Sequence, residues 1–239
     1  MDVNIDSPGA RALGVVEARI DLDRPLSAEL IEDITDVCAR AEDAADADVL
    51  VLRLTGTGLP PGGWPGTPEV HLVGKWEKAL RRLERVDLFT VGVCEHRCTP
   101  AALEILLTTD HRIGGPDTAR ATADGAPGAM WPGMALHRLV QQVGLAAARR
   151  LVLLPATADG PALLDAGVFD EIVPETDVGV AAVVARAAGT VGSETAIRRR
   201  LLLEAVTASH EEALGTHLAA CERALRLRRT GAAAARAAR

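Results

Sequence analysis

The sequence has very few aromatic residues: tyrosine is absent, and aromatic side chains occupy only 2% of the 239 positions. So small a supply excludes the surfaces on which single-stranded nucleic acids stack their bases. Positive charge is also in deficit, because 26 Lys and Arg face 33 Asp and Glu, for a formal net charge of −7. A general nucleic-acid binder needs a positive surface to displace counterions, so the charge balance argues against that class.

Segments that would target the chain to a membrane or to secretion are not found either. No run of about 18 apolar residues predicts a transmembrane helix, and no apolar signal core follows a basic start. The four cysteines are widely spaced, unlike a disulfide framework. With 48% hydrophobic and 25% charged residues, the composition is typical of a folded protein, which we expect in the reducing cytoplasm.

What the sequence does contain is an alternation of strand and helix patterns. Buried strands are predicted at 12–21, 48–55 and 88–94, and helices at 27–44, 70–86 and 100–109. This alternation predicts an α/β fold with a mostly parallel sheet covered by helices. Further along, the pattern predicts helices at 133–155, 159–166 and across 178–229, with a short strand at 169–173. The Ala- and Arg-rich end, 230–239, is expected to be frayed.

Several well-known catalytic signatures are absent: the G-x-S-x-G elbow, the Walker A loop, H-E-x-x-H, and G-x-G-x-x-G after the first strand. The segment from Cys94 to Cys98, which includes His96, places two thiols and an imidazole close together. A structural zinc site normally draws four ligands from two such clusters, and the other cysteines are isolated. We therefore expect no metal site and interpret the segment as a strand end with a loop.

The predicted helix that starts near residue 100 is the most informative stretch for chemistry. Thr99 is a good N-cap and Pro100 suits the first helical position. The backbone N–H of Ala101 would then lack an intrahelical partner and would point at any anion placed there. Glu104 follows within an apolar helix, where burial would raise its pKa. Two interpretations stay open: an oxyanion donor with a general acid or base, or a carboxylate on the polar stripe of an ordinary helix.

A Gly- and Pro-rich stretch, 56–68, follows the second predicted strand. Its glycines, Gly63 among them, let the backbone approach a ligand closely. Trp64 can present an N–H group as a second donor, whereas Pro65 has none. The alternative interpretation is a plain surface connection.

The order and spacing of several short segments resemble the crotonase (enoyl-CoA hydratase/isomerase) superfamily over nearly the whole chain. These segments are Leu22-Asp23-Arg24-Pro25, Leu54-Thr55-Gly56, the block from Val91-Gly92-Val93 through Leu103-Glu104 to Asp110-His111-Arg112-Ile113, Leu139-Val140 with Val143-Gly144-Leu145-Ala146, and Asp165-Ala166-Gly167-Val168 with Ile172-Val173-Pro174. The resemblance implies a crotonase-like spiral of ββα units at 1–187, a C-terminal helical region at 188–229 and a disordered tail at 230–239. It also implies an acyl-CoA substrate, no cofactor beyond that coenzyme A, and a homotrimer or hexamer.

The resemblance assigns roles by matched position. Backbone N–H groups of Ala101 and of the Gly63–Trp64 segment would polarise the thioester carbonyl and stabilise an enolate. Glu104 matches the first catalytic glutamate of the hydratases, and Asp124 is the carboxylate nearest to the position of the second. A further basic residue, Arg24, would meet the phosphates of coenzyme A, with a solvated surface arginine as the alternative.

Where the sequence departs from the family pattern, it resembles one branch of the family. Pro100, Ala101 and Ala102 stand where the family has three glycines, and Asp124 is one methylene shorter than glutamate. Together with the C-terminal segment 211–218, they resemble auxiliary proteins that assist a type III polyketide synthase. Those proteins help to build 3,5-dihydroxyphenylacetyl-CoA from malonyl-CoA, for the dihydroxyphenylglycine of glycopeptide-type antibiotics.

The implied function is dehydration and aromatisation of a poly-β-keto thioester. The alternatives are a non-catalytic partner of the synthase and a general enoyl-CoA hydratase.

Overall fold

The computed structural model describes residues 12–56, 60, 63–118, 132–153, 158–188, 191–192 and 194–237. Along the chain these form β1 (Val15–Asp21), α1 (Ala28–Asp43), β2 (Val49–Thr55), α2 (Val70–Leu83), β3 (Phe89–Cys94), α3 (Pro100–Leu106), β4 (His111–Gly114), α4 (Ala135–Leu153), α5 (Gly160–Asp165), β5 (Glu171–Ile172), α6 (Thr176–Ala187), α7 (Thr195–Ala205) and α8 (His210–Ala237). The chain divides into two compact units, Met1–Ser193 and Glu194–Arg239. Over the described ranges, no helix combines the length and apolar character that a membrane-spanning segment needs.

The sheet of the first unit has the order β1-β2-β3-β4-β5, and the neighbouring strands pair in parallel. Val15 of β1 lies opposite Val49 of β2, which lies opposite Phe89 of β3. The predicted α/β fold with a parallel sheet is confirmed. The sequence pattern missed β4, because the strand is only four residues long and its first two, His111 and Arg112, are polar and half-buried.

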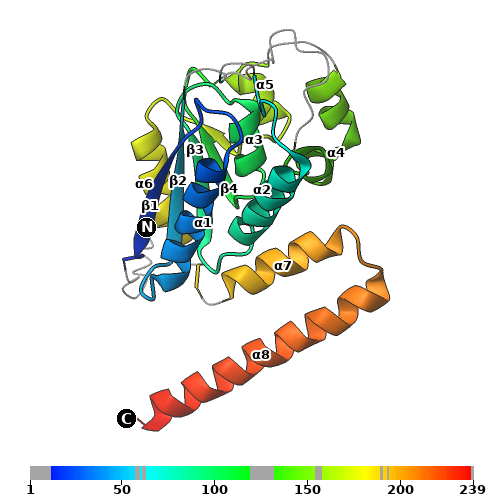
Figure 1. The fold of residues 1–239 in the computed structure, drawn as a ribbon. Helices are drawn as coiled ribbons and strands as arrows, with labels where there is room; N and C mark the ends of the chain where they lie inside the picture. Colours follow the sequence, from blue (N-terminus) through cyan, green and yellow to red (C-terminus); the bar gives the residue numbers. More distant parts are fainter. Residues whose placement is uncertain are drawn as a thin grey trace, which may run out of the picture. The chain divides into compact units, whose positions relative to one another are not determined.

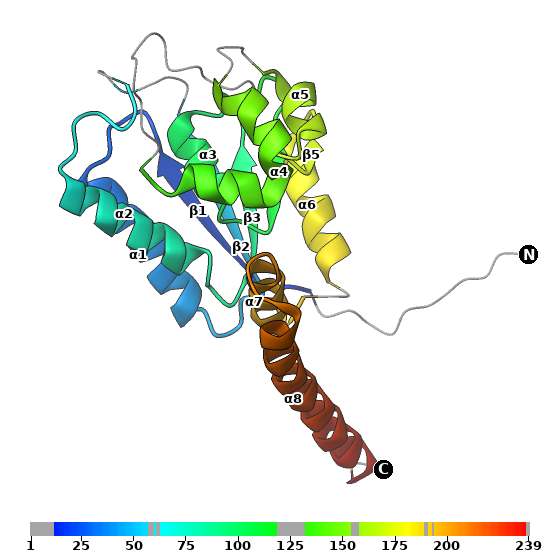
Figure 2. The same ribbon diagram turned by 90° about the vertical axis from the view of Figure 1, so that its right-hand side faces the viewer.

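Helices cover both faces of the sheet, and β2 separates two hydrophobic cores. Leu50 and Leu52 point into the core shared with α1, α2, α3 and α4. Val49 and Val51 point to the other face, where they meet Val180 of α6. Figure 2 shows α1 and α2 on one side of the strands and α6 on the other. A strand buried on both faces reads as a continuous apolar run, which is why β2 was predictable.

Helix boundaries follow local chemistry. The Oγ of Ser27 accepts a hydrogen bond from the Leu30 N–H at 3.3 Å, so the predicted cap of α1 is confirmed. The helix predicted near 133–155 corresponds to α4, which is interrupted at Gly144, where φ is 77° and ψ is 159°. Glycine reaches that conformation without the steric penalty of a Cβ. In the second unit, α8 extends to Ala237 into the segment expected to be frayed, in keeping with the high helix propensity of alanine.

Candidate active site

The start of α3 is built as its sequence predicts. The Oγ1 of Thr99 accepts a hydrogen bond from the Ala102 N–H at 3.1 Å, and Pro100 occupies the first helical turn. The next residue, Ala101, is buried, and among the described residues no acceptor meets its backbone N–H. A buried N–H without a protein partner suits an acceptor supplied by a ligand.

Glu104, one turn further along α3, has a fully buried carboxylate, with an exposed fraction of 0%. Its Oε1 accepts a hydrogen bond from the indole Nε1 of Trp64 at 2.9 Å. Its Oε2 accepts two more, from the indole Nε1 of Trp76 at 2.7 Å and from the backbone N–H of Gly133 at 2.7 Å. Three N–H donors from three separate segments therefore converge on one carboxylate.

The pKa of Glu104 is set by two opposing influences. Burial is the larger, since it penalises the charged form, and it raises the pKa from the ordinary value of 4.5 to about 7. The N–H donors of Trp76, Trp64 and Gly133, and then the positive charge of Arg138, act in the opposite direction. A carboxyl whose pKa is raised toward neutrality suits a group that both takes and gives protons.

The alternative that Glu104 lies on the polar stripe of an ordinary helix is wrong. All seven residues of α3 are buried. Figure 1 shows α2 and α4 beside α3, and residues of these helices join it in one core. A carboxylate enters such a core only with hydrogen-bond partners, and Glu104 has three.

The indole of Trp64 has a role that the sequence did not predict, whereas its backbone N–H was predicted as an oxyanion donor. Its indole N–H is engaged by Glu104, and its ring meets that of Trp76 edge to face, with centroids 5.7 Å apart. The neighbouring Gly63 N–H donates to the carbonyl of Pro60 at 2.8 Å. Within the described part of the chain, the backbone N–H of Trp64 has no acceptor, so of the two predicted backbone donors it is the one that no protein group engages.

Trp76 and Gly133 are functional-site residues that sequence reasoning missed. Trp76 appears in the sequence only as part of the apolar face of a helix, but a buried indole N–H normally finds a partner. That rule, applied to a nearby carboxylate, could have suggested the pair. No local signal marks Gly133, where a Cβ would lie 2.3 Å from Glu104 Oε2.

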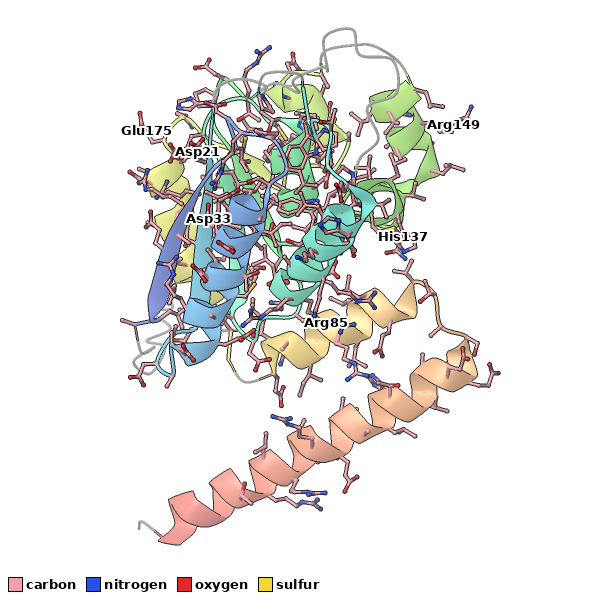
Figure 3. The ribbon with its side chains drawn as sticks, in the orientation of Figure 1. Asp21, Asp33, Arg85, His137, Arg149 and Glu175 are labelled. Carbon is pink, nitrogen blue, oxygen red and sulfur yellow. The ribbon has the colours of Figure 1, made fainter. Side chains whose placement is uncertain are left out.

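Asp124 and Arg24 are the other two predicted site residues. Asp124 lies in 119–131, outside the described residues. Arg24 pairs with Asp33 of α1, and its Nε donates to the Asp21 carbonyl at 3.0 Å. Figure 3 labels Asp21 at the end of β1 and Asp33 on α1. A role for Arg24 at the phosphates of coenzyme A remains a prediction.

The cysteine-containing segment after β3 separates its candidate ligands. Cys94 and Cys98 are buried cysteines, whereas His96 is exposed. In the part of the chain that the structure describes, no group of three or more His, Cys, Asp or Glu side chains is placed to hold a metal ion. Another histidine, His137, lies exposed on α4 (Figure 3).

Comparison with known proteins was made at the level of sequence and of fold. No family model matches the chain. A protein of Amycolatopsis orientalis named enoyl-CoA-hydratase is 40% identical over 213 residues, which cover 89% of this chain and 97% of that protein. This likeness spans almost the full length of both proteins.

Solved structures give the same result for the fold. An enoyl-CoA hydratase/isomerase from Marinobacter aquaeolei matches with a TM-score of 0.74 at 15% identity, over 92% of this chain and 90% of that one. An enoyl-CoA hydrotase/isomerase family protein from Silicibacter pomeroyi matches with a TM-score of 0.73 at 19% identity, over 89% and 95%. Fold and sequence together show that the chain belongs to the enoyl-CoA hydratase/isomerase family of enzymes, the crotonase superfamily.

Proposed function

We propose that the chain acts on an acyl-CoA thioester, with the Ala101 N–H binding the carbonyl oxygen and Glu104 moving the proton. The observation that carries this proposal is a buried, protonatable carboxyl one turn beyond a buried N–H that has no acceptor in the described structure. The ionised Glu104 removes a proton from the carbon next to the carbonyl, and the N–H stabilises the enolate oxygen. The protonated Glu104 then gives that proton to a β-hydroxyl, which leaves as water.

Proton transfer at Glu104 requires an opening step, because its carboxylate has no exposed surface. Trp64 covers Oε1 by a single hydrogen bond, whereas Oε2 is held by two. Movement of Trp64 would therefore uncover one carboxylate oxygen while the other stays fixed. The backbone N–H of Trp64 would serve as the second oxyanion donor.

The finer proposal concerns the substrate. We expect a poly-β-keto thioester made by a type III polyketide synthase, which this protein would dehydrate and aromatise to 3,5-dihydroxyphenylacetyl-CoA. The support is the resemblance of 211–218 and of the replaced glycines at Pro100, Ala101 and Ala102 to that branch of the family. Coenzyme A would enter as part of the substrate, without another cofactor, and the assembly would be a homotrimer or hexamer.

Product formation from malonyl-CoA by the synthase, with and without this protein, tests the proposal. Replacing Glu104 with glutamine should reduce the stimulation at least about 100-fold, the usual contribution of a general acid or base. The same Glu→Gln change at exposed Glu32 on α1 is the matched control and should leave the stimulation intact. Full stimulation by the Glu104→Gln protein would remove the proton-transfer role.

A non-catalytic partner of the synthase is the second candidate. The observation in its favour is that the carboxylate of Glu104 is already occupied by three donors, as a purely structural carboxylate would be. Size-exclusion chromatography of the two proteins together separates the candidates. A stable complex whose stimulation survives Glu104→Gln and needs stoichiometric amounts would favour the partner role. Stimulation at trace amounts without a complex would favour the enzyme.

General hydration of short enoyl-CoA substrates is the remaining alternative from the family. The absorbance of crotonyl-CoA measures it directly. We expect little activity, because Asp124 is shorter than the second glutamate of the hydratases. Rapid loss of absorbance would instead identify a general hydratase.

A further inference from the structure

Arg138 of α4 is a buried arginine close to the candidate site, with an exposed fraction of 6%. Its Nη1 and Nη2 donate to the two carboxylate oxygens of Glu77, each at 2.9 Å. Its Nε donates to Glu84 at 3.0 Å. A further hydrogen bond runs from Nη1 to the backbone carbonyl of Gly133. Arg138 thus ties α2 to the turn that precedes α4.

These two tied segments carry the two donors that meet at one oxygen of Glu104. Trp76, which donates to Oε2, is the residue before Glu77 on α2. Gly133 donates its N–H to the same Oε2 and gives its carbonyl to Arg138. The two polar groups of Gly133 flank a single Cα, so fixing its carbonyl also limits where its N–H points.

We propose that Arg138 is a positioning residue for Glu104. By binding both Glu77 and the Gly133 carbonyl, it fixes the two N–H groups, of Trp76 and Gly133, that donate to Oε2 of Glu104. This proposal rests on the proposed function in one respect: the purpose of the positioning is proton transfer by Glu104. The planar guanidinium is suited to this task, since it makes two parallel bonds to one carboxylate and further bonds at fixed angles. A lysine in its place would keep the charge but not the geometry.

Few charged groups face Glu104 from the elements around it. From α4, Arg138 acts on it directly. From α2, Glu77 and Glu84 are both paired with Arg138. Within α3, Glu104 is the sole charged residue of 100–106, and the adjoining turn 63–66 contains none. Loss of Arg138 therefore removes both a nearby cation and the support of two donors, and each change favours the protonated carboxyl.

Tryptophan fluorescence gives a readout that does not depend on activity. Because both Trp64 and Trp76 donate to Glu104, ionisation of that carboxyl should change their emission, and the Glu104→Gln protein identifies this component by lacking it. In the full-length protein we expect a midpoint near the pKa of about 7. In Arg138→Met it should rise by about one pH unit, the order expected for a carboxylate that loses a neighbouring cation.

Another buried arginine provides the matched control. Arg53 of β2 has an exposed fraction of 4% and is surrounded by carboxylates on the other face of the sheet. An Arg53→Met protein should keep the wild-type midpoint even though it also loses a buried cation. Arg138→Lys is the variant to use if Arg138→Met fails to fold. It should raise the midpoint by less than Arg138→Met, because lysine keeps the positive charge but cannot make the two parallel hydrogen bonds of the guanidinium.

The outcomes separate this proposal from the proposed function. Unchanged midpoints in both Arg138 variants would overturn the positioning role, and so would an equal rise in Arg53→Met. If the midpoint rises and the pH dependence of product formation moves with it, both proposals are supported. If the midpoint rises while product formation keeps its wild-type pH dependence, Arg138 positions Glu104 but Glu104 is not the proton carrier.

Discussion

Arg53 and Arg138 are both buried, yet they connect to different parts of the molecule. The partners of Arg53 are the carboxylates of Glu17, Glu95 and Asp177. These come from β1, from the residue after β3 and from α6, so the cluster joins the sheet to the helix on one face. Its outer members reach water, since the side chain of Asp177 is 83% exposed.

Arg138, on the opposite side of the sheet, has partners with little access to water. The side chains of Glu77 and Glu84 are 24% and 18% exposed. A third partner, the carbonyl of Gly133, belongs to a residue that also holds Glu104. Two similar ion clusters thus differ in what they support: one fastens elements of the fold, and the other also holds the donors of a protonatable carboxyl.

The largest expected effect is on stability. Replacing Arg138 with methionine removes a buried cation from two poorly hydrated carboxylates, which should lower the free energy of unfolding by about 3–5 kcal/mol. Arg53→Met should lower it by about 1–3 kcal/mol, because water can hydrate Asp177 and Glu17. Urea denaturation of the two variants and the wild type measures both. A greater loss for Arg53→Met would contradict the comparison.

The pH dependence of stability isolates Glu104. Its folded pKa of about 7 lies above the ordinary 4.5, so between these values the folded state binds more protons than the unfolded one. The contribution of Glu104 to the free energy of unfolding is therefore fully present below pH 4.5, and it is lost as the pH rises through the folded pKa of about 7. Relative to Glu104→Gln, the wild type should lose about 3 kcal/mol of unfolding free energy across that window. Arg53→Met should show the same dependence, and a flat difference would exclude the raised pKa.

Gly133, which binds both Arg138 and Glu104, allows a steric test of the packing around the Glu104 carboxylate. A Cβ at this position would lie 2.3 Å from Glu104 Oε2 and 2.6 Å from Leu80 Cδ1. We expect Gly133→Ala to lower the free energy of unfolding by about 1–3 kcal/mol. Gly74 on α2 is exposed and has open space around it, so Gly74→Ala should raise stability by up to about 1 kcal/mol. Thermal unfolding of the pair would refute the close contact if both variants were stabilised.

The smallest expected effect compares the two indoles. Trp76→Phe and Trp64→Phe each remove one donor from the carboxylate, so each should raise the pKa of Glu104, by up to about one unit. The rise should be greater for Trp76, whose hydrogen bond is shorter and is the largest influence opposing burial. Carboxyl-carbon NMR of the two variants measures the shifts. A larger rise in Trp64→Phe would reverse the assigned order.

The sequence predicted the fold better than the site. Continuous apolar runs such as β2 and the capped starts of α1 and α3 depend on neighbouring residues, and these were confirmed. The short β4 and the break at Gly144 depend on packing and backbone geometry that no periodicity reveals. At the candidate site, Glu104 and Ala101 could be predicted together because they share one helix. Trp76, Gly133 and Arg138 approach from distant segments, so only the folded chain brings them together.

A pH titration of the Glu104 carboxyl by carboxyl-carbon NMR, with the signal assigned by its loss in Glu104→Gln, is the most direct test of the central claim. The claim is that burial and three N–H donors leave this carboxyl poised to exchange its proton near neutrality. We predict a midpoint of about 7. A midpoint at the ordinary value of 4.5 would contradict the account.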